Sequence, residues 1–213
     1  MNLIFEIAGY VGLVIAGLVP IANPLAAAPV FISMTAELSK TKRVKTATYA
    51  CLYMAAILIV FLFFGVFLLK FFGISLEALR IAGGLIIAYM GFRMLFPDSQ
   101  KSSSGHEAVD DPQSVAFVPL ALPMMSGPGA ISVIISMAAH AGSEEILTNR
   151  VAGYAIVTFG IFLSALICWL VLRSSDLVFK LLGHTGIDAL TRIMGFLLVC
   201  VGCQFVLSSL QPA

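Results

Sequence analysis

Two proline breaks inside apolar stretches hold the residues best placed to bind a ligand. Asn23 precedes Pro24 in the first stretch, and a second stretch carries Ser-Gly-Pro-Gly from residue 126. Proline removes a backbone N–H and interrupts helical hydrogen bonding, while glycine lets a ligand approach the backbone closely. The predicted substrate-binding residues are Asn23, Pro24, Ser126, Gly127, Pro128 and Gly129.

The chemistry of such breaks favours a zwitterionic ligand. The N-terminal end of a half-helix presents N–H groups and a positive dipole end, which suit a carboxylate. The C-terminal end presents free carbonyls, which suit an ammonium group, and the Asn23 amide can donate and accept hydrogen bonds. The alternative for each break is a local kink whose turn satisfies its own polar groups.

The composition places these breaks in a membrane. Of 213 residues, 60% are hydrophobic and 11% are charged, whereas soluble domains carry about 25% charged residues. The net charge of +1 gives no reason to expect nucleic acid as a partner. Membrane lipid and a small-molecule substrate are the expected partners, and a homo-oligomer is left open.

Six apolar stretches predict an all-α polytopic membrane protein with six transmembrane helices, of which the first and fourth are broken. They cover residues 5–35, 47–72, 79–96, 115–139, 151–172 and 187–207. The chain is predicted to be one transmembrane domain, 1–213, in which a polar linker at 98–114 joins three-helix units at 1–97 and 115–213.

The two units resemble each other. Residues 79–85, LRIAGGL, match 191–197, TRIMGFL, and the proline pair at 20–24 has a counterpart at 123–128. Because each unit has an odd number of spans, the second is predicted to be inverted relative to the first. In transporters, paired breaks in inverted repeats mark a binding site near the bilayer midplane.

Positive charge predicts the orientation. One side collects nine lysines and arginines, including the KTKRVK cluster at 40–45, which is predicted to be a short loop; the other side collects Lys70, Arg80 and Arg150. The first side is therefore expected to be cytoplasmic, in the inner membrane of a bacterium, with both termini periplasmic.

Ionisable residues and motifs limit the chemistry. No Asp or Glu lies deep in a stretch, and the histidines at 106, 140 and 184 fall in predicted loops, which argues against proton-coupled drug efflux. Arg80 and Arg192 are expected to reach the membrane interface or to cap a neighbouring helix. Gly84 and Ala88, four residues apart, are expected to pack against another helix.

No catalytic or cofactor motif is present. HExxH, GxSxG and phosphate-loop sequences do not occur, so no catalytic residue, cofactor or enzyme activity is predicted. Cys200 and Cys203 form a CxxC without a second ligand pair, and they are interpreted as small apolar residues on a helix rather than as a metal site.

The chain resembles the MarC family of bacterial inner-membrane proteins. The resemblance lies in VPIANPLAAAPVFISM, GISLEALRIAGGLIIAYMGFRMLFP, AFVPLALPMMSGPGAIS and TRIMGFLLVCVGCQFV. It implies a six-helix protein related to LysE-type amino-acid exporters, with relatives that transport alanine and glycine. By position, the family's broken-helix elements fall on Asn23, Pro24, Gly127, Pro128 and Gly129.

Together these features predict an exporter or exchanger of small neutral amino acids or similar zwitterionic solutes. A multidrug or antibiotic efflux protein and a non-transporting membrane scaffold are the alternatives. A transporter would have Asn23 and Ser126 facing a cavity, whereas a scaffold would have them facing lipid.

Overall fold

Helices make up almost all of the chain that the structure describes, which is residues 2–35, 38–96, 121, 125–140 and 150–210 of a computed structural model. The helices are α1 Asn2–Ala22, α2 Pro24–Met34, α3 Lys40–Phe71, α4 Leu76–Leu95, α6 Pro128–His140, α7 Arg150–Arg173 and α8 Ser175–Leu210. No strand occurs within these described ranges, and the all-α fold class is confirmed. The predicted linker at 98–114 lies outside them.

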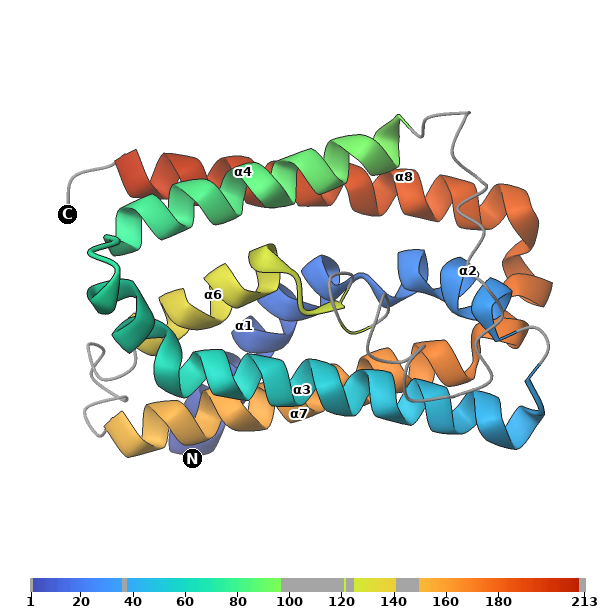
Figure 1. Ribbon diagram of the computed structural model, residues 1–213, viewed down its shortest axis with the longest axis horizontal. Helices are drawn as coiled ribbons and strands as arrows, with labels where there is room; N and C mark the ends of the chain where they lie inside the picture. The colour runs from blue at the N-terminus through green and yellow to red at the C-terminus, as the bar shows by residue number, and fades with distance from the viewer. Residues whose placement is uncertain (1, 36–37, 97–120, 122–124, 141–149, 211–213) are drawn as a thin grey trace.

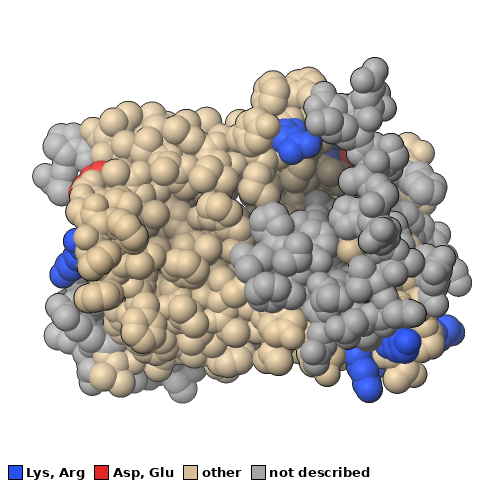
Figure 2. Space-filling model, viewed as in Figure 1, with Lys and Arg blue, Asp and Glu red and all other residues tan. Residues whose placement is uncertain are grey.

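Among the described residues, four helical segments are long and apolar enough to cross a membrane. They are Lys40–Phe71, Leu76–Leu95, Val151–Arg173 and Asp188–Leu210, and shorter apolar helices cover Ile7–Ala22 and Pro128–His140. Large apolar side chains such as Phe67 and Phe159 are exposed on them. Figure 2 shows a broad uncharged surface, with most of the visible charged side chains toward its two ends and one basic side chain on its upper edge. An uncharged band between charged ends is the surface expected of helices that face lipid.

The helices form two outer pairs around a central group (Figure 1). α3 lies beside α7 and α4 beside α8, while α1, α2 and α6 lie between the two pairs. The buried core is apolar and draws on all of these elements, with Leu18, Phe31, Leu58, Ile134 and Ile161 among its fully buried side chains. The described residues around the two breaks therefore lie in the interior of the molecule, whereas the first part of α1, with Phe5 and Leu13, is exposed.

Glycines bring α4 and α8 into backbone contact. A Cβ added at Gly84 would lie 2.6 Å from the Gly202 carbonyl oxygen, and one added at Gly91 would lie 2.5 Å from the Gly195 carbonyl oxygen. A Cβ at Gly202 would lie 2.6 Å from the Ala88 nitrogen. Small residues permit this approach where a larger side chain would separate the helices. The predicted packing role of Gly84 and Ala88 is confirmed.

The KTKRVK cluster is helical, which corrects the prediction of a loop. α3 begins at Lys40, and the Ser39 hydroxyl oxygen accepts a hydrogen bond from the Lys42 backbone N–H at 3.4 Å. Hydropathy marks only the part of a helix that lies in lipid, so polar first turns that project beyond it are missed. A serine cap satisfies the N–H groups that start such a helix.

The histidines and the last stretch need a similar correction. His140 is the last residue of α6 and His184 lies within α8 rather than in loops, while His106 is outside the described residues. α8 starts at Ser175 instead of residue 187, and it bends at Gly183, whose φ of 61° and ψ of −179° are not helical. The kink separates the short segment 175–182, which mixes apolar residues with Asp176 and Lys180, from Asp188–Leu210, which is long and apolar enough to cross a membrane.

Candidate functional site

The first break centres on Asn23. Its N–H donates to the Val19 carbonyl at 2.9 Å, and its carbonyl accepts from the Ala27 N–H at 3.1 Å, so it closes α1 and opens α2. Its φ is 39°, the only positive value at a non-glycine position among the described residues. Asparagine adopts this left-handed region more readily than most residues. Pro24, at the first position of α2, has the fixed φ that suits a helix start.

The Asn23 side chain reaches across to α4. Asn23 is only 6% exposed, and its Nδ2 donates to the Met94 sulfur at 3.3 Å. A thioether is a weak acceptor. The amide is therefore buried in the protein at the end of α1, where it contacts α4 through a weak acceptor.

The second break is a capped turn before α6. The Ser126 N–H and hydroxyl both donate to the Ala121 carbonyl, at 3.0 Å and 2.7 Å, and Ser126 is fully buried. The Gly127 carbonyl accepts from the Ile131 N–H at 3.1 Å. Both hydrogen-bond donors of Ser126 are thus used within its own turn, as expected if the break is only a local kink. A ligand could still donate a hydrogen bond to the hydroxyl oxygen.

The structure brings the two breaks together. A Cβ added at Gly129 would lie 3.3 Å from Ile21 Cγ2, and one added at Gly17 would lie 3.2 Å from Met137 Cε. Contacts that advance along α1 thus move backwards along α6, so the helices are antiparallel. Ile21 lies two residues before Asn23 and Gly129 two residues after Gly127, which places the breaks at one level.

Five of the six predicted site residues are buried here and one is not. Asn23, Pro24, Ser126, Gly127 and Gly129 are buried, whereas Pro128 is exposed. Gly129 is closely packed as well, since an added Cβ would lie 2.6 Å from Ile87 Cγ1 of α4. The absence of a side chain at Gly129 therefore allows α4 to pack closely, and this packing role is separate from the predicted role in ligand binding.

The charge at the breaks comes from the backbone. α2 and α6 both begin at the breaks and run toward opposite ends of the molecule (Figure 1). The first N–H groups of each helix have no acceptor within their own helix, and the two N-terminal dipole ends are positive. Neither α2 nor α6 contains an Asp, Glu, Lys or Arg. The arrangement can therefore bind an anionic group, such as a carboxylate, without a basic side chain.

Ser164 is a buried polar residue that the sequence analysis did not single out. It is fully buried, and its hydroxyl has no hydrogen-bond partner among the described residues. It lies one turn after Gly160 of α7, where an added Cβ would lie 2.5 Å from Val14 Cγ1 of α1. Residues four apart share a helix face, so Ser164 lies on the face of α7 that packs on the broken helix. A serine within an apolar stretch is the signal that could have identified it.

Arg80 contacts side chains at the C-terminal end of a neighbouring helix, near the place where one of its two expected roles, a helix cap, would put it. Its Nε donates to Ser136 Oγ at 3.2 Å and its Nη2 lies 3.0 Å from His140 Nε2. His140 Nδ1 lies 2.7 Å from the Ser136 carbonyl oxygen. These contacts join the start of α4 to the C-terminal end of α6, where a cation also complements the helix dipole. Arg80 therefore fixes α6 from the end opposite the break.

The comparisons with known proteins agree on one family. Residues 9–213 match the family described as MarC family integral membrane protein. The chain is similar to the inner membrane protein MarC of Escherichia coli strain UTI89, with 41% identity over 207 residues that cover 94% of this chain and 93% of that protein. The MarC proteins of Escherichia coli strain K12 and Shigella flexneri show the same identity and coverage. No solved structure matches the chain.

Proposed function

The chain belongs to the MarC family of integral membrane proteins, and from this premise we propose that it transports small neutral amino acids or similar zwitterionic solutes. The observation that carries the proposal is the meeting of two half-helix N-termini at the paired breaks, beside Ile21 and Gly129. Interrupted helices of this kind are where transporters bind their substrates.

The ligand would use both ends of the breaks. Its carboxylate would accept from the first N–H groups of α2 and α6, where the dipoles favour a negative charge. Its ammonium group would donate to the Asn23 amide oxygen and to the carbonyls that end α1. The neighbouring side chains are small or apolar, as with Ala22 and Ala130, which favours a substrate with a short neutral side chain.

The membrane architecture of the proposal is six spans in two inverted three-helix repeats. The antiparallel contact of α1 with α6 supports it. The glycine contacts between α4 and α8 support it too, because Gly84 faces Gly202 as Gly91 faces Gly195. A two-fold axis that relates α4 to α8 would exchange the Gly84–Gly202 pair with the Gly91–Gly195 pair. Gly84 would then be equivalent to Gly195. The alignment of the two repeats by sequence similarity instead matches Gly83 to Gly195, so it differs from the alignment by symmetry by one residue.

The proposed location is a bacterial inner membrane with both termini periplasmic. The similar proteins of Escherichia coli are named inner membrane proteins. The start of α1 and the end of α8 lie toward one end of the molecule, and the lysine-rich start of α3 lies at the other (Figure 1). Positive residues usually mark the cytoplasmic side.

The alternative functions receive less support from these residues. A scaffold has no need to bury polar groups at helix breaks, yet Asn23 and Ser126 are both buried. A proton-coupled drug exporter usually carries an acidic or histidine relay within the membrane. The interior helices α2 and α6 contain no acidic residue, and the one histidine of α6 is at its last position.

Counterflow in proteoliposomes tests the proposal. Vesicles that contain the purified protein and unlabelled alanine should take up labelled alanine from outside, because exchange through one site concentrates the label. Unlabelled glycine inside should also drive uptake, whereas lysine or a lipophilic cationic drug should not. Protein-free vesicles are the control. Exchange of the drug without exchange of any amino acid would favour the efflux alternative, and no exchange of either would favour the scaffold.

A further inference from the structure

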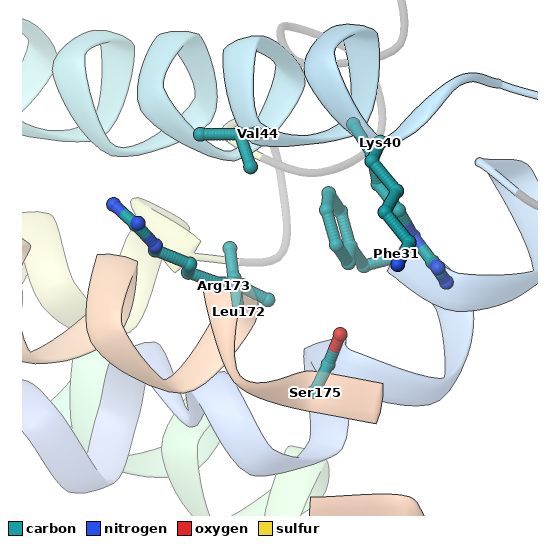
Figure 3. Close-up of a pocket in the computed structure, with 7 residues that line it drawn as sticks. Phe31, Lys40, Val44, Leu172, Arg173 and Ser175 are labelled. Atoms are coloured by element: carbon teal, nitrogen blue, oxygen red, sulfur yellow. The ribbon is translucent and has the colours of Figure 1, made fainter. Parts of the chain in front are cut away.

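A cavity lies away from the helix breaks. Its volume is about 220 Å³, and it opens where α2, the start of α3, the end of α7 and the start of α8 meet. Figure 3 shows Lys40 and Arg173 on opposite sides of it, with Phe31 between them. None of the predicted substrate-binding residues lines it, so it is distinct from the proposed transport site.

The walls of this cavity are positively charged. Lys40, Arg43 and Arg173 line it, and none of the described residues that line it is acidic. Within the described ranges, Lys40 and Arg173 make no ion pair. An anion that binds between positively charged walls is favoured electrostatically.

Aromatic and hydroxyl groups hold the two arginines in place. The Arg173 guanidinium carbon lies 4.8 Å from the centre of the Trp169 ring, and Trp169 Nε1 donates to Thr48 Oγ1 at 3.0 Å. Arg43 Nε donates to Thr35 Oγ1 at 2.9 Å. Stacking leaves the N–H groups of a guanidinium available in the plane of the group. Arg173 is thus oriented without a carboxylate and keeps its donors.

A buried hydroxyl completes the polar lining. Ser175 is 1% exposed and its oxygen points toward the cavity in Figure 3. It is the first residue of α8, so the N–H groups and the positive dipole end of that helix lie at the same place. Arginine, lysine, a hydroxyl and a helix N-terminus are the groups that proteins combine to bind phosphate.

We propose that this cavity binds a phosphate group, carried by an anionic lipid or by a soluble phosphate. The lining favours the lipid. Phe31 and Val44 give the cavity an apolar wall that could contact a glycerol or acyl segment. Trp169 lies beside it, and tryptophan is enriched at the depth of lipid headgroups. Basic pockets between helices bind anionic headgroups in other membrane proteins. The proposal does not depend on the transport activity.

Lipid competition measures this binding directly. The purified full-length chain in detergent is mixed with equal amounts of phosphatidylglycerol and phosphatidylcholine, and the bound lipids are counted by native mass spectrometry. The wild-type protein should retain phosphatidylglycerol preferentially. Arg173→Gln and Lys40→Gln should each lower that preference about fivefold, since a basic residue near a lipid headgroup contributes about 1 kcal/mol. Arg93→Gln, an exposed arginine of α4 outside the cavity, should leave the preference unchanged.

A second arm separates the two sources of phosphate. Inorganic phosphate at constant ionic strength should leave the melting temperature unchanged if the ligand is a lipid. If phosphate raises it in the wild type and not in Arg173→Gln, the site binds a soluble phosphate. The proposal is overturned if neither probe binds, or if Arg93→Gln loses as much lipid preference as Arg173→Gln. Lys40→Gln, at the exposed start of α3, keeps the test valid if Arg173→Gln does not fold.

Discussion

Replacing Gly91 by alanine is expected to destabilise the protein by separating α4 from α8. The added Cβ would lie 2.5 Å from the Gly195 carbonyl oxygen and 2.8 Å from the Val199 nitrogen. Both are backbone atoms of a helix, so they cannot move as a side chain does. Overpacking of this kind costs about 1–3 kcal/mol. The melting temperature of the purified protein in detergent is the measurement, and Gly202→Ala should lower it similarly.

Gly12→Ala is the matched control for this prediction. Gly12 lies within α1, and no atom is within 4 Å of a Cβ added there. Because alanine favours a helix more than glycine does, the control should be neutral or slightly stabilising. If Gly91→Ala melts at the wild-type temperature, α4 and α8 do not make this backbone contact, and the glycine support for inverted repeats is lost.

Replacing Asn23 by glycine is expected to weaken substrate binding while keeping the fold. Glycine adopts the positive φ of this position without strain, so the variant removes only the amide. Leaving a polar group of the ligand unpaired in a buried site costs about 1–3 kcal/mol, which is roughly a tenfold to hundredfold loss of affinity. Asn23→Ala should lose the same affinity and also melt at a lower temperature, because alanine is strained at a φ of 39°.

The contact of Asn23 with Met94 supplies the control. Met94→Leu removes the sulfur acceptor and keeps a similar side-chain volume. If the amide serves only to hold α4 through that sulfur, Met94→Leu and Asn23→Gly should lower the melting temperature alike and leave substrate affinity intact. That pattern would remove the binding role of Asn23.

The helix breaks could be predicted from the sequence because their causes are local. Pro24 and Pro128 are each the first residue of a helix, where a missing N–H breaks no intrahelical hydrogen bond, and the structure has breaks at both places. Pro20, in contrast, lies inside α1 without ending it. Which of the predicted residues present polar groups to a ligand could be predicted less completely. Ser126 bonds its own turn and Pro128 is exposed, and both depend on how the turn is oriented rather than on residue type.

Contacts between distant segments could not be predicted in this way. The pairing of Gly91 with Gly195 depends on which helices lie side by side, and residue spacing within one helix does not determine that. The burial of Ser164 and the approach of Arg80 to His140 depend on the same information. Hydropathy also missed the polar start of α3, because it marks the lipid-facing part of a helix and not its full length.

Ligand-dependent melting of the wild-type protein tests the central claim most directly. A ligand that binds only the folded state raises the melting temperature with its concentration. L-alanine and L-alaninamide have nearly the same size and share the ammonium group, but the amide lacks the carboxylate. If the N-terminal ends of α2 and α6 bind the carboxylate, alanine should raise the melting temperature and alaninamide should not. Equal stabilisation by both, or none by either, would contradict a zwitterion site at the helix breaks.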